Sequence, residues 1–87
     1  MKTFNDLEFK PHPSGIGGIL SRIKFDNGYG ASIVQGPHTY GGEDGLYELA
    51  VLNSNGDLIY DTPITSDVEG YLSEAQVTDL LIKIQQL

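Results

Sequence analysis

Two histidines are the first residues of the chain that could do chemistry. His12 and His38 each lie beside a proline, in Pro-His-Pro and Gly-Pro-His, and Glu43 and Asp44 follow the second one. Imidazoles and carboxylates bind metals, but a metal site needs further ligands at a recognisable spacing, such as a second histidine four residues away. Neither histidine has one. We therefore interpret both as exposed loop histidines and expect no metal.

The other candidates for catalysis lack the surroundings that catalysis needs. The glycine-rich residues 15–18 precede a strand, whereas a phosphate-binding loop follows a strand and begins a helix. Paired carboxylates, as at Glu43 and Asp44 or at Asp67 and Glu69, could exchange protons, but only in a deep pocket. A chain of 87 residues can hardly enclose one. We expect a protein that is not an enzyme and holds no cofactor.

Tyrosines beside glycines indicate binding instead. Tyr29, Tyr40 and Tyr47 flank glycines in loops and at strand ends. A tyrosine next to glycine joins a rigid amphipathic ring to an adaptable backbone, as in many recognition surfaces. The alternative is that these rings pack on the sheet, and the pattern leaves both interpretations open. The residues that we expect to contact a partner are Tyr29, His38, Tyr40, Glu43, Asp44, Asp67 and Glu69.

Charge divides the chain into two parts. The net charge is −7, with no cysteine, and residues 1–24 hold four basic and two acidic groups, a balance of +2. Residues 25–87 hold ten acids against Lys83 alone, a balance of −9. An acidic chain is a poor binder of duplex nucleic acid, and no apolar run approaches the ~20 residues of a membrane span. The acidic part can keep the protein soluble and steer a basic partner towards it.

Alternating apolar residues predict a first hairpin over residues 19–35. A two-residue turn at Asn27-Gly28 would send the apolar residues of the two strands to opposite faces. We therefore expect a wider loop over about 26–30 that sets Phe25 opposite Ala31 and Ile23 opposite Ile33.

A second hairpin and a helix follow. Residues 46–53 are apolar on both faces, which is typical of a central strand. A turn at residues 54–57 then sets Val51 opposite Tyr60 and Leu52 opposite Ile59. Ser73 begins a helix to about residue 86, because the Ser-x-x-Gln spacing forms a capping box.

These elements predict a single α+β domain over residues 1–87. Two hairpins form a four-stranded antiparallel sheet, residues 7–10 are a candidate fifth strand, and one C-terminal helix packs on one face. Residues 1–18 form a flexible leader rich in proline and glycine. The second sheet face is partly apolar, which favours a homodimer or another partner.

Three segments resemble a family of small accessory proteins encoded by bacteriophages and prophages. They are FDNGYGASIV (25–34), TYGGEDGLYELAVL (39–52) and YDTPITSDVEGYLSEAQV (60–77). The resemblance implies an accessory protein in the cytoplasm of a bacterial host. Such proteins often inhibit host defence, either by occupying a host protein or by sequestering a signalling nucleotide.

The resemblance and the acidic charge together predict a non-enzymatic, anti-CRISPR-like inhibitor. Its partner would be a host defence protein or nuclease complex, whose cationic groove the acidic part of the chain would occupy. Two alternatives remain open. One is an oligomeric sponge that holds a signalling nucleotide at the loop of residues 36–45, and the other is a structural accessory of the virion.

Overall fold

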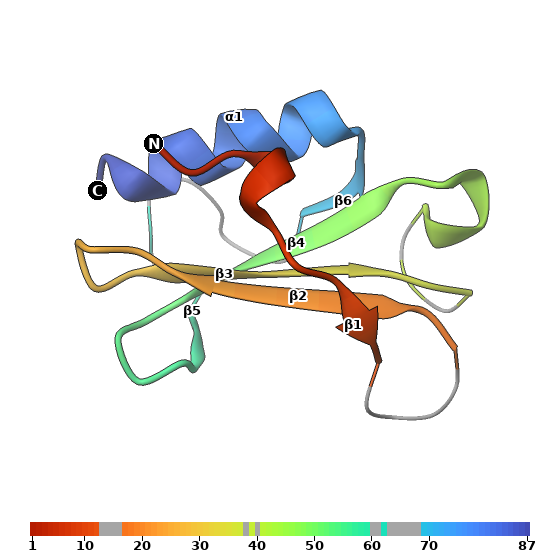
Figure 1. Ribbon diagram of the computed structural model, residues 1–87, viewed down its shortest axis with the longest axis horizontal. Helices are drawn as coiled ribbons and strands as arrows, with labels where there is room; N and C mark the ends of the chain where they lie inside the picture. Colours follow the sequence, from red (N-terminus) through yellow and green to blue (C-terminus); the bar gives the residue numbers. More distant parts are fainter. Residues whose placement is uncertain (13–16, 38, 40, 60–61, 63–68) are drawn as a thin grey trace.

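The computed structural model describes residues 1–12, 17–37, 39, 41–59, 62 and 69–87. Strands β1 (Lys10–Pro11), β2 (Ile19–Lys24), β3 (Gly30–Gln35), β4 (Tyr47–Leu52) and β5 (Leu58–Ile59) lie side by side in chain order, each antiparallel to its neighbour. Strand β6 (Glu69–Leu72) also pairs with β4, and helix α1 (Glu74–Gln85) crosses above the sheet (Figure 1). Short 3-10 helices, η1 (Phe4–Asp6) and η2 (Gly42–Asp44), complete the elements. The expected α+β class, with an antiparallel sheet and one C-terminal helix, is confirmed.

Both hairpin registers differ from those expected. Ile23 pairs with Ala31 in place of Ile33, and Val51 pairs with Ile59 in place of Tyr60. The first difference is two residues, so the apolar residues of β2 and β3 still share a face. The second is one residue, which moves Ile59 to the face of Val51.

The cause is the same turn in both hairpins. Gly28 and Gly56 have φ values of 90° and 84°, whereas Asn27 and Asn55 are not among the residues with positive φ. A two-residue type I′ turn requires positive φ at both central positions. A three-residue loop, a type I turn followed by a left-handed glycine, requires it at the glycine alone. Each Asn-Gly pair therefore forms the last two positions of a three-residue loop.

The hydrophobic core lies between α1 and the sheet face beneath it. Ser73 caps the helix as expected: its side chain accepts from the Gln76 backbone N–H, and the Gln76 side chain accepts from the Ser73 N–H. The fully buried side chains come from β3, β4 and α1, so the central strands and the apolar stripe of the helix form one cluster. They are Ala31, Ile33, Leu49, Val51, Val77, Leu81 and Ile84.

The N-terminal segment packs on the domain instead of leading up to it. The Phe4 backbone N–H donates to Thr78 Oγ1 at 3.0 Å, and the Lys2 backbone N–H donates to Gln85 Oε1 at 2.9 Å. The Phe4 and Phe9 rings lie 5.0 and 5.6 Å from the Tyr47 ring. In Figure 1 the segment descends from α1 to the sheet edge, where β1 begins at Lys10, the last residue of the expected strand.

Candidate functional site

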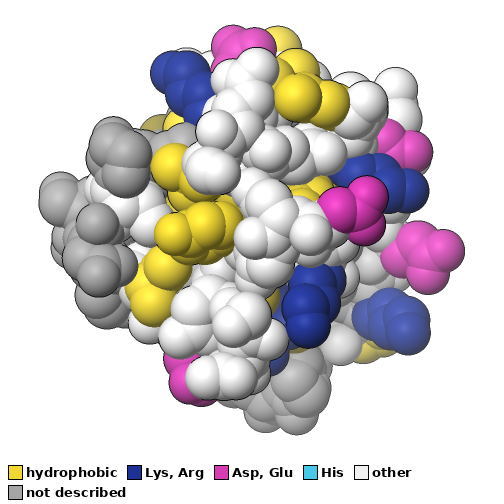
Figure 2. Space-filling view, turned by 90° about the vertical axis from the view of Figure 1, so that its left-hand side faces the viewer, with side chains coloured by type: hydrophobic (Ala, Val, Ile, Leu, Met, Phe, Trp, Pro, Cys, Tyr) yellow, Lys and Arg dark blue, Asp and Glu magenta, His cyan; other side chains and the backbone are white. Residues whose placement is uncertain are grey.

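The sheet face opposite the helix, here called the open face, carries most of the basic residues. No described helix or strand lies over it (Figure 1). Strand alternation and register place Lys10, Arg22 and Lys24 on this face, together with Glu48 of β4 and small or apolar residues of β3 and β4. Three of the five Lys and Arg residues of the chain therefore share one surface. Figure 2 shows the end with the hairpin turns, where the blue basic side chains of the right half lie among magenta acidic ones and a yellow hydrophobic strip lies to their left.

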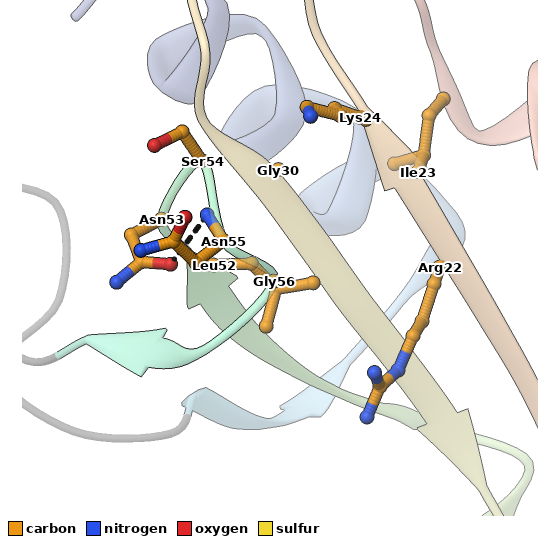
Figure 3. Close-up of a pocket in the computed structure, with 9 residues that line it drawn as sticks. All are labelled: Arg22, Ile23, Lys24, Gly30, Leu52, Asn53, Ser54, Asn55 and Gly56. Carbon is orange, nitrogen blue, oxygen red and sulfur yellow. Dashed lines mark hydrogen bonds between the residues drawn. The ribbon is translucent and has the colours of Figure 1, made fainter.

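A pocket of about 260 Å³ opens on this face, between β2 and the β4–β5 turn. Lys24 extends from β2 towards Gly30 and the turn, whereas the Arg22 guanidinium points away from both, along β3 (Figure 3). Gly30 pairs with Lys24 on one side and with Leu52 on the other, so the missing side chain leaves a gap between them. The turn residues Ser54, Asn55 and Gly56 form the opposite wall.

Gly30 also has a structural reason to lack a side chain. A Cβ at this position would lie 2.6 Å from the Ile23 carbonyl oxygen, closer than real contacts allow. Gly30 belongs to β3, so the wide loop expected over residues 26–30 is not formed. The glycine permits close approach of β2 and β3 and leaves the gap as a consequence.

The opposite end of the sheet carries exposed carboxylates. We call the surface formed by Glu43 and Asp44 of η2, Glu69 and Tyr71 of β6, and Glu74 of α1 the acidic end. All five side chains are exposed, and η2, β6 and the start of α1 gather at the right of Figure 1. No Lys or Arg occurs in the sequence between Lys24 and Lys83. The acidic end therefore has no basic residue close to it in the chain.

Tyr71 stands out within the acidic end. It is 62% exposed and has a φ of 57°, a left-handed backbone that side chains other than glycine, asparagine and aspartate rarely adopt. Tyr47 pairs with Leu72 and Leu49 with Glu69, so two residues of β6 lie opposite Glu48 alone. This is a β-bulge, a feature that redirects side chains. A Cβ added at Gly41 would lie 3.0 Å from the Tyr71 ring, so the loop before η2 packs against it.

Tyr47 connects the acidic end to the N-terminal aromatic cluster. Burial raises the pKa of its hydroxyl, and the nearby Glu74 carboxylate raises it further. A side-chain hydrogen bond with Gln35 acts in the opposite direction on the same pKa. The hydroxyl is therefore protonated at neutral pH and acts as a neutral hydrogen-bonding group.

The structure brings some of the expected contact residues together and separates one from them. Glu43, Asp44 and Glu69 all lie at the acidic end. Tyr29 follows the β2–β3 turn at the other end and is partly buried against the core, so it packs on the sheet. The remaining three, His38, Tyr40 and Asp67, fall outside the described residues.

The sequence interpretation missed Tyr71, Arg22 and Lys24 as contact residues. Alternation within residues 19–25 could have identified the two basic residues, because positions 22 and 24 share a face. Among the described residues, no group of three His, Asp or Glu side chains is placed to hold a metal ion. Likewise, no described helix is both long and apolar enough to cross a membrane.

Comparisons with protein-family models, curated proteins and solved structures give no match to this chain. The two surfaces described above are therefore the features of this chain from which a function can be inferred.

Proposed function

We propose that the protein is a non-enzymatic inhibitor that binds a basic surface of a bacterial host complex through its acidic end. One observation carries the proposal: an exposed aromatic ring, Tyr71, is held in a strained conformation among carboxylates. A left-handed backbone costs an ordinary residue roughly 1–2 kcal/mol. Such strain occurs mainly at functional sites, where the surrounding structure maintains it.

The chemistry of the acidic end suits a cationic protein partner. Tyrosine is among the residues that contribute most to protein interfaces, since it buries a large rigid ring and keeps a hydroxyl for hydrogen bonding. Glu43, Asp44 and Glu69 around it would steer the protein to a surface rich in lysine and arginine. A groove that normally binds nucleic acid is such a surface, so occupying it would inhibit a nuclease or defence complex.

The test compares charge reversal at the two ends of the molecule. The triple variant Glu43→Lys, Asp44→Lys, Glu69→Lys removes the acidic end. A matched control reverses Asp26, Asp57 and Asp79, exposed acids of the two hairpin turns and of α1, and changes the net charge equally. Both variants are expressed in bacteria with an active CRISPR system that restricts a test phage.

The wild type and the control should restore phage plaques, and the acidic-end variant should not. Association with the captured complex should also slow as salt rises, because exposed charges are screened beyond about 8 Å at physiological ionic strength. Equal protection by both variants would exclude the acidic end as the inhibitory surface. Absence of protection by the wild type would exclude inhibition of that defence system.

A further inference from the structure

The two hairpin turns carry the same Asn-Gly pair on the same backbone. In the β2–β3 turn the Gly28 backbone N–H donates to the Phe25 carbonyl oxygen at 3.1 Å. At the same position of the β4–β5 turn, the Gly56 backbone N–H donates to the Asn53 carbonyl oxygen at 3.0 Å. The two turns therefore differ in what surrounds the asparagine side chain and not in how the chain turns.

An asparagine that precedes glycine can lose its side-chain amide without an enzyme. The backbone nitrogen of the glycine loses its proton and attacks the side-chain carbonyl carbon of the asparagine. Ammonia leaves, a cyclic succinimide forms, and water then opens the ring to give aspartate or isoaspartate. Glycine hinders the attack least, since it has no side chain. Because the reaction is intramolecular, its rate depends on whether the side chain can swing towards that nitrogen.

The Asn27 side chain is held at both of its polar atoms. Its Nδ2 group donates to the Ile84 carbonyl oxygen at 2.8 Å, which joins the β2–β3 turn to the last turn of α1. Its Oδ1 accepts from the Tyr29 backbone N–H at 3.0 Å. In Figure 1 this turn lies below the C-terminal end of α1. An attack by the Gly28 nitrogen therefore requires the side chain to leave both partners.

The Asn55 side chain has neither of these contacts. The Asp57 backbone N–H, which corresponds to that of Tyr29, donates to Asn53 Oδ1 at 3.0 Å instead. The Asn55 backbone N–H donates to the same oxygen at 2.9 Å (Figure 3). These bonds hold the backbone only. The Asn55 side chain is exposed and forms no hydrogen bond within the described part of the chain, so it can rotate towards the next nitrogen.

We propose that Asn55 is a site of spontaneous deamidation and that the fold protects Asn27 from the same reaction. The Gly56 nitrogen displaces ammonia from the Asn55 side chain, and water completes the conversion. The product places a new carboxylate in the wall of the open-face pocket that Lys24 also lines. Isoaspartate in addition lengthens the backbone of the turn. The proposal does not depend on the proposed inhibition.

The experiment incubates the full-length protein at mildly alkaline pH, in native buffer and in guanidinium chloride, and follows both asparagines by peptide mass spectrometry. In native buffer, Asn55 should convert at least about tenfold faster than Asn27, which is the rate factor for one hydrogen bond that must first break. In guanidinium chloride the two should convert at similar rates, because the turns and α1 are then unfolded. Asn55→Gln is the control. It should abolish conversion at position 55, since glutamine must close a larger ring, and leave the rate at Asn27 unchanged.

Three results would overturn the proposal. Two are the absence of conversion at Asn55 in native buffer and equal rates at Asn55 and Asn27 in that buffer. The third is a difference that persists in guanidinium chloride, because its cause would then be the preceding residues, Asp26 and Ser54, and not the fold. No partner takes part in the reaction, so failure of the proposed inhibition leaves these results unaffected.

The contact that protects Asn27 is tested separately through stability. Asn27→Asp replaces the amide donor with a carboxylate beside the Ile84 carbonyl oxygen, at the negative end of α1. It should lower the urea midpoint of unfolding by roughly 0.5 M. Asn55→Asp makes the same change on an exposed side chain and should leave the midpoint almost unchanged. Equal midpoints for the two variants would refute the protection by Ile84.

Discussion

The strain at Tyr71 can be measured by comparing Tyr71→Gly with Tyr71→Ala. Both variants remove the same exposed ring, so its contacts cancel in the comparison. Alanine normally stabilises a folded chain by roughly 0.5–1 kcal/mol relative to glycine, because glycine loses more conformational freedom on folding. At a φ of 57°, alanine instead suffers the 1–2 kcal/mol cost of the left-handed region, which glycine avoids.

The balance of the two effects favours Tyr71→Gly by about 0.5–1 kcal/mol, which reverses the usual order. Urea unfolding followed by circular dichroism would measure it, since a difference of this size moves the midpoint by roughly 0.5 M for a small domain. Ala75→Gly, at an exposed position of α1, is the control and should destabilise by about 0.5–1 kcal/mol. If Tyr71→Ala is more stable than Tyr71→Gly by the usual margin of about 0.5–1 kcal/mol, the backbone at residue 71 is not strained, and the strain no longer supports a functional Tyr71.

Three further predictions concern the core, the helix cap and pH. Ser21 is buried, and its hydroxyl has no hydrogen-bond partner among the described residues. Ser21→Ala should therefore stabilise the fold by about 1 kcal/mol and raise Tm by ~4–8 °C, whereas a lower Tm would contradict this. Ser73→Ala should cost about 1 kcal/mol in urea unfolding, because it removes the capping box. Folding raises the pKa of the Tyr47 hydroxyl above its ordinary value of 10.0. The stabilisation that the protonated hydroxyl gives is therefore complete below about pH 10 and is lost as the pH rises through the pKa of the folded protein. Glu74→Gln should shift that loss to lower pH, measured by the NMR titration of the ring.

Strands β2 to β5 and helix α1 were predictable from the sequence because each has a local physical cause, whereas β6 and the two 3-10 helices were not predicted. The helix begins where Ser73 and Gln76 can cap it, and its apolar stripe faces the sheet. The registers were not predictable from the same signals. Asn-Gly is compatible with both two- and three-residue turns, and only the backbone of Asn27 and Asn55 decides between them. The order of strands beyond each hairpin depends on non-local pairing, so the position of β6 beside β4 also had to come from the structure.

The two candidate surfaces differ in how much the sequence reveals. Arg22 and Lys24 alternate with core residues, so their common face follows from strand periodicity alone. The pocket beside them does not, because it requires the β4–β5 turn to stand next to Gly30. Tyr71 gives no local signal, since tyrosine has no preference for positive φ. Its conformation results from a bulge in the pairing of β4 with β6.

The acidic end and the hairpin turns lie at different ends of the molecule, although Asp26 and Asp57 of the acidic part of the chain lie in the hairpin turns. The molecule is 31 Å long, and Figure 1 places η2 at one end of that axis and the β4–β5 turn at the other. Exposed charges separated by more than about 8 Å interact weakly at physiological salt. Reversing Glu43, Asp44 and Glu69 should therefore leave the field at Arg22 and Lys24 almost unchanged. A variant that loses inhibition together with its cooperative unfolding transition would indicate that the fold has changed, because charge reversal at exposed side chains alone shifts the free energy of unfolding by only about 0.5 kcal/mol per site.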